Sequence, residues 1–156
     1  MPILIALAIV SGPILPASAA SAADQAATAA TNRPLEFSDK GVPDPRLEGK
    51  WKLAAVDGTP VPRGKRWPKA FIVWFKAGEV TGMNACNGFF GPYRVVGSDL
   101  QTVLGQTTAG CASPVPDKWD EATMAAVSGG HFEVSSDGAK LTLSAPGAPT
   151  YVFRRR

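Results

Sequence analysis

Short segments in which hydrophobic and polar residues alternate fill the chain from about residue 50 onward, and glycine-containing turns separate them. Alternation with a period of two is typical of strands with one buried face, and closely spaced turn signals are typical of antiparallel sheets. The segment 70–75, AFIVWF, is continuously apolar instead, which predicts a strand buried on both faces. We expect strands over residues 50–56, 70–75, 79–84, 92–96, 99–104, 131–135, 140–144 and 150–154.

One segment carries helix signals. Asp117 is a favourable N-cap residue, and Asp120 and Glu121 place negative charge in the first turn, where the helix dipole favours it. A helix of about twelve residues is unstable alone in water, so it must pack on the sheet, and Trp119 would anchor it. The predicted fold is therefore mainly β (α+β), a highly curved antiparallel sheet or small open β-barrel with one covering α-helix.

The chain divides into three parts by composition. Residues 1–22 contain an uncharged apolar run, too short for a membrane span, followed by two small-x-small sequences, as in a cleaved signal peptide. Residues 23–46 are poor in branched apolar residues and are predicted to form a flexible linker. Residues 47–156 form the folded domain. We expect a periplasmic or secreted protein, with no transmembrane anchor after cleavage and no acylation cysteine at the cleavage site.

The charge adds little to this interpretation. The net charge of +3 equals the three arginines at the C-terminus, Arg154–Arg156. A second basic stretch lies at 63–69, where charges are best explained as a solvated loop. We therefore expect no nucleic-acid partner.

The two cysteines, Cys86 and Cys111, leave two hypotheses open. A disulfide is the default in an exported protein, and a bridge closing a loop of about 25 residues contributes about 3.5 kcal/mol in the chain-entropy description. The alternative is a thiol-active enzyme that uses Cys86 with His131, the single histidine. The sequence contains no C-x-x-C, no G-x-S-x-G and no phosphate-binding loop, so no catalytic residue, metal or cofactor is predicted.

The string G-x-x-x-C-N-x-F-x-G-x-Y resembles the central signature of the META/HslJ family of small bacterial envelope proteins. The opening strand and the second cysteine segment are also similar to that family, as is the order of the helix and the closing strands. The matching residues are Gly49, Trp51, Gly82, Cys86, Asn87, Phe89, Gly91, Tyr93, Thr107 and Cys111.

The resemblance implies an exported β domain with no established enzymatic activity, linked to heat shock and antibiotic tolerance at the envelope. We expect a monomer with a binding or stabilising role in envelope stress, whose partner is an envelope protein, a peptide or a lipid. A protease inhibitor or assembly chaperone is a further alternative. Trp51, Trp74 and Phe75 are candidates to line an apolar cleft, or they fill the core.

Overall fold

The computed structural model describes residues 33–61, 71–85, 87–108, 119 and 122–156. All but the first of the described residues belong to one compact unit, Pro34–Arg156. The elements are β1 (Gly49–Val56), β2 (Thr59–Pro60), β3 (Ile72–Lys76), β4 (Glu79–Met83), β5 (Gly88–Val96), β6 (Asp99–Thr102), β7 (Gly105–Gln106), α3 (Ala122–Val127), β8 (Gly130–Val134), β9 (Lys140–Ser144) and β10 (Tyr151–Arg155).

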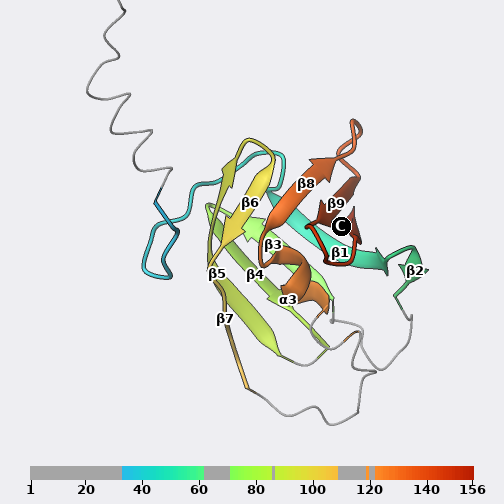
Figure 1. The fold of residues 1–156 in the computed structure, drawn as a ribbon, viewed down its shortest axis with the longest axis horizontal. Coiled ribbons are helices and arrows are strands. Elements are labelled where there is room, and N and C mark those ends of the chain that lie inside the picture. The colour runs from blue at the N-terminus through green and yellow to red at the C-terminus, as the bar shows by residue number, and fades with distance from the viewer. Residues whose placement is uncertain (1–32, 62–70, 86, 109–118, 120–121) are drawn as a thin grey trace, which may run out of the picture. The chain divides into compact units, whose positions relative to one another are not determined.

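Eight of these strands close into an antiparallel barrel (Figure 1). Neighbours around it follow the order β1, β3, β4, β5, β6, β8, β9 and β10, and β10 pairs with β1 to complete the ring. The two-residue strands β2 and β7 add to β1 and β5. The mainly β fold with one covering helix is therefore confirmed among the described residues, and the barrel is closed rather than open.

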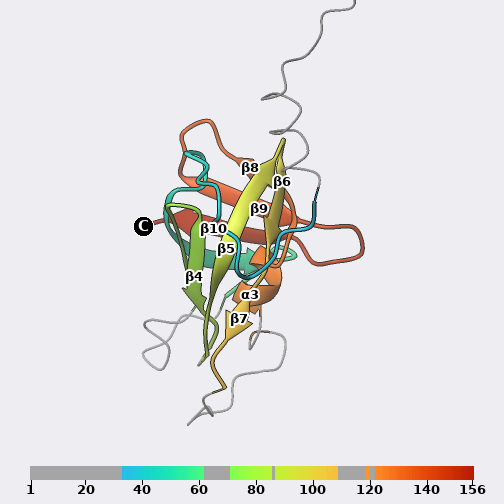
Figure 2. The same cartoon turned by 90° about the vertical axis from the view of Figure 1, so that its left-hand side faces the viewer.

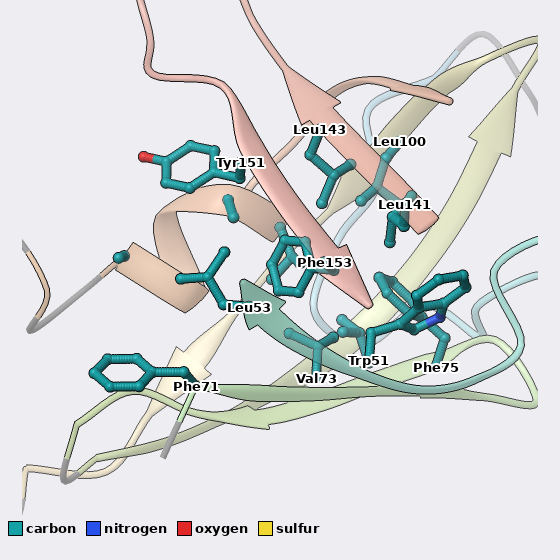
Figure 3. Close-up of a cluster of buried hydrophobic side chains, with 14 of the residues drawn as sticks. Trp51, Leu53, Phe71, Val73, Phe75, Leu100, Leu141, Leu143, Tyr151 and Phe153 are labelled. Atoms are coloured by element: carbon teal, nitrogen blue, oxygen red, sulfur yellow. The ribbon is translucent and has the colours of Figure 1, made fainter. Parts of the chain in front are cut away.

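The barrel interior holds one hydrophobic core (Figure 3). The alternation predicted from sequence selects its members. In β9 the side chains of Leu141 and Leu143 are buried, and in β10 Phe153 is fully buried between half-buried or exposed neighbours. Trp51 and Phe75 are the largest contributions from β1 and β3, and neither exposes any surface.

Strand β3 differs from its prediction. Val73 and Phe75 point into the core, but Trp74 between them is 37% exposed and Ile72 is half-buried. The strand is therefore buried on one face only. Apolar content alone could not separate a two-sided buried strand from one whose outer face is apolar and exposed.

The helix α3 covers one end of the barrel, where it contacts β4 and β9 (Figures 1 and 2). Four of its six residues are buried, and Trp119, the predicted anchor, belongs to the core. Asp117, Asp120 and Glu121, which we expect at its start, lie outside the described residues. No helix in the described part of the chain is long and apolar enough to cross a membrane.

The chain from 33 to 46, the described part of the predicted linker, lies against the barrel. In Figure 2 it passes across β5. The backbone N–H of Val42 donates to the carbonyl of Tyr93 at 2.8 Å, Gly41 is buried, and the ring of Phe37 meets that of Phe90 edge-on at 5.7 Å. The compact unit thus begins at Pro34, ahead of the boundary at Leu47 drawn from composition. The expected signal peptide lies outside the described residues.

Candidate binding face

The two signature segments that carry the cysteines meet on the barrel. The backbone N–H of Thr107 donates to the carbonyl of Gly88 at 2.9 Å, and the N–H of Gly88 donates to the Thr107 hydroxyl at 3.1 Å. That hydroxyl also lies 3.4 Å from the side-chain oxygen of Asn87. Cys86 and Cys111 themselves lie outside the described residues, as does the predicted bridge between them.

Two glycines of the signature, Gly82 and Gly91, lie so close to neighbouring atoms that no side chain would fit there. A Cβ at Gly82 would lie 2.1 Å from the buried ring of Phe89. A Cβ at Gly91 would lie 1.9 Å from the carbonyl oxygen of Val103, which is backbone and cannot rotate away. These residues are therefore required by close packing, not by a site.

Replacing Gly91 by alanine is therefore expected to lower the free energy of unfolding by about 2 kcal/mol, since overpacking forces the backbone to shift. Gly88 in the same strand is the matched control. A Cβ there would find its nearest neighbour at 3.7 Å, so Gly88→Ala should change stability by less than about 0.5 kcal/mol. Chemical denaturation of both variants measures the contrast, and equal losses would contradict the packing argument.

Tyr93, the last signature residue, joins three segments at one end of the barrel. Its hydroxyl donates to the Glu48 carboxylate at 2.8 Å and accepts the N–H of Asp44 at 3.1 Å. The same Glu48 oxygen accepts the N–H of Ala77 at 2.9 Å. Burial raises the pKa of the Tyr93 hydroxyl far above its usual value, so the group remains a donor. The arrangement is structural, because each of these polar groups is engaged within the fold.

Trp51 and Gly49 of the signature form a second junction, with Arg155. The Trp51 indole N–H donates to the carbonyl of Leu47 at 2.7 Å, and the Arg155 guanidinium lies 4.2 Å from the Trp51 ring centroid. Arg155 also donates to the carbonyl of Glu48 at 2.7 Å. Gly49 has φ +123° and a Cβ there would meet the guanidinium at 2.8 Å. One of the three terminal arginines therefore closes the barrel.

Sequence reasoning missed Asn84. Its side chain is almost fully buried, and its Oδ1 accepts the backbone N–H of Met124 at 2.9 Å. The first N–H groups of a helix have no partner within the helix, so Asn84, directly after β4, supplies one and fixes α3 on the barrel. An asparagine at the end of a strand gives no sequence signal for a capping contact 40 residues away.

His131 lies on the outside of β8. It pairs in register with Asp99 of β6, and its Nδ1 lies 3.5 Å from the Asp99 carboxylate, with both side chains mostly exposed. Its suggested partner, Cys86, lies outside the described residues. The described residues contain no cluster of three metal-ligating side chains.

The three residues predicted to line an apolar cleft, Trp51, Trp74 and Phe75, do not lie on the same side of the sheet. Trp51 and Phe75 are fully buried in the core, whereas Trp74 lies on the opposite face of β3. They share no cleft, because adjacent residues of a strand point to opposite sides of the sheet. Of the three, only Trp74 presents its ring to the outside.

Trp74 lies in an outward-facing row across four strands. The register joins Lys50 of β1, Trp74 of β3, Thr81 of β4 and Phe90 of β5. The neighbouring row joins Lys52, Ile72, Met83 and Gly88. We name these two rows the Trp74 face. Three of its large apolar side chains are substantially exposed: Trp74 (37%), Met83 (37%) and Phe90 (48%).

Two lysines flank the exposed indole. The Nζ of Lys50 lies 4.8 Å from the Trp74 ring centroid, and the Nζ of Lys76 lies 5.1 Å from it. Cation–π attraction of this kind holds each ammonium group against the face of the ring, and both lysines remain exposed to water. Among the described residues neither lysine lies in an ion pair.

A shallow pocket of about 260 Å³ continues the Trp74 face past Phe90. Its apolar part includes Phe37, Phe90 and Pro92, and its polar part includes Asp39 and Glu79. The chain from 33 to 46 forms one wall. The pocket opens to solvent beside the edge-on rings, so it extends the exposed apolar surface from β3 to the N-terminal segment.

Comparisons with known proteins give the family. No curated protein gives a significant match. The fold is similar to that of a protein solved by NMR, with a TM-score of 0.54 and 22% sequence identity. The alignment covers 70% of this chain and 90% of the NMR chain. Another NMR structure, of a protein from Burkholderia xenovorans, has 20% identity and a TM-score of 0.55, over 92% of this chain and 98% of its own. At these identities the likeness concerns the fold alone. The META domain matches residues 45–156, so this chain belongs to the META domain family.

Proposed function

We propose that this META domain is a binding module of the cell envelope that acts through the Trp74 face rather than an enzyme. The observation that carries the proposal is the distribution of aromatic side chains. Trp51, Phe75 and their neighbours fill the barrel, whereas Trp74 and Phe90 gather outside in one row. Contiguous exposed apolar surface rimmed by polar residues is typical of an interaction site.

The proposed location follows from the N-terminal sequence. The apolar run within residues 1–22 ends in two small-x-small sequences, which is the pattern of an exported protein. Binding a partner in the periplasm or outside the cell is consistent with a role in envelope stress, which the family resemblance suggests.

We further propose a disulfide between Cys86 and Cys111. The hydrogen bonds between Gly88 and Thr107 support it. Gly88 lies two positions after Cys86 and Thr107 lies four positions before Cys111, so these bonds bring the two segments together. A bridge there would stabilise the junction of the two signature segments.

A photo-crosslinking amino acid in place of Thr81 tests the binding proposal. Thr81 is exposed at the centre of the Trp74 face, between Trp74 and Phe90. We expect covalent adducts with an envelope component when the exported protein is irradiated in cells. Glu133, exposed on β8, is the control position and should give none. Equal adduct yields at the two positions, or none at either, would refute the proposal.

A further inference from the structure

We propose that the partner of the Trp74 face is the surface of an anionic lipid bilayer. This inference rests on the proposed function, because it names the partner of the same face. Three features of the described residues support it: the shape of the face, its charge and the chemistry of its exposed side chains.

The shape favours a flat partner. Strands β1, β3, β4 and β5 each pair with a strand on both sides, so their backbone groups are already hydrogen-bonded within the barrel. An extended peptide therefore cannot add to this face as a further strand, which is the usual way in which a sheet binds a peptide. The outside of a closed barrel is convex, and a convex surface touches its partner through the tips of side chains.

The charge favours an anionic partner. Lys50 and Lys76 flank Trp74, and Lys52 lies at the end of the second row. One carboxylate, Glu79, stands opposite Lys76 in the register. Around Trp74, three lysines stand against one glutamate, and no ion pair with a described residue neutralises Lys50, Lys52 or Lys76. The pocket beyond Phe90 adds Asp39 and Lys40, whose charges balance, so the region is positive.

The side chains match the interface of a bilayer. An indole has an apolar body and a polar N–H, and tryptophan is enriched at the level of the lipid headgroups. The ammonium groups of Lys50 and Lys76 lie beside the Trp74 ring and both lysines are exposed, so the two charges stand at the level of the indole, where phosphate groups of a bilayer would lie. Met83 and Phe90 extend the exposed apolar surface across two more strands. The combination of an exposed indole, neighbouring ammonium groups and further apolar side chains favours a lipid interface.

Binding of the full chain to vesicles tests the inference. Vesicles of equal parts phosphatidylglycerol and phosphatidylcholine are the probe, and sedimentation measures the partition coefficient. Each basic residue near an anionic surface contributes about a fivefold factor, so K50Q/K76Q should weaken binding by about 25-fold. Trp74→Ala should weaken it by at least about tenfold, because the exposed indole loses its contact with the interface. The apolar run near the N-terminus is present in every variant and cannot cause these differences.

Lys140→Gln is the matched charge control, since Lys140 is exposed on β9, which is separated from β1 by β10 and lies three strands from Trp74. It should bind as the unsubstituted chain does, and vesicles of phosphatidylcholine alone should bind all variants weakly. Unchanged binding of K50Q/K76Q and Trp74→Ala would overturn the lipid inference. If Thr81 still crosslinked to a protein in that case, the binding proposal would stand. Failure of both experiments would remove both.

Discussion

Replacing Trp51 by alanine is expected to lower the free energy of unfolding by about 4 kcal/mol, the largest effect that we expect of a single substitution. The side chain is fully buried, and truncating a buried tryptophan loses its transfer free energy and leaves a cavity. The substitution also removes the hydrogen bond to Leu47 and the surface on which Arg155 rests. Denaturant unfolding measures the loss.

Trp74→Ala is the matched control for this prediction. It removes the same side chain from the adjacent strand, but from the outer face, where the indole is 37% exposed. Its cost should stay below about 1 kcal/mol, since no core cavity forms. Similar losses for the two variants would contradict the assignment of Trp51 to the core and Trp74 to the outside. A stable Trp74→Ala protein is also the one required for the vesicle experiment.

The alternation of residues in the sequence was sufficient to place most strands and their buried faces. Leu141 and Leu143 were placed on one side of their strand and lie there in the core. The short helix and its anchor Trp119 were also predicted correctly. These features depend on local spacing, which a single sequence displays directly.

Closure of the barrel could not be predicted in the same way. It depends on pairing of β1 with β10, whose residues lie about a hundred positions apart. Arg155 takes part in that closure, although its charge appeared in the sequence only as part of a basic tail. Long-range pairing of this kind leaves no periodic pattern in either strand.

The Trp74 face was missed for a related reason. The run AFIVWF contains both core and surface residues, and hydrophobicity cannot tell them apart. Only the register shows that Trp74 lies beside Thr81 and, one strand further, Phe90. A face is a property of several strands together, so residues distant in sequence define it.

Replacing Cys86 by serine is expected to lower the free energy of unfolding by about 3.5 kcal/mol under oxidising conditions, because it removes the proposed bridge to Cys111. The bridge restricts the unfolded chain by closing a loop of about 25 residues. The hydrogen bonds between Thr107 and Gly88 use no atom of either cysteine, so the substitution removes none of their groups and Cys86→Ser should still fold. Thermal unfolding of the exported, oxidised protein provides the measurement.

Reduction provides the matched control and separates the bridge from the thiol hypothesis. A reductant should lower the melting temperature of the unsubstituted protein nearly to that of Cys86→Ser, and should leave the variant unaffected. The double variant Cys86→Ser/Cys111→Ser should match the single one, because removing either sulfur removes the same bridge. A thiol of Cys86 that reacts freely in the native, unreduced protein would refute the bridge and favour the thiol-active alternative with His131. Cys86 would then need a chemical role, whereas a bridge gives it a structural role, as Gly91 and Tyr93 of the same signature have.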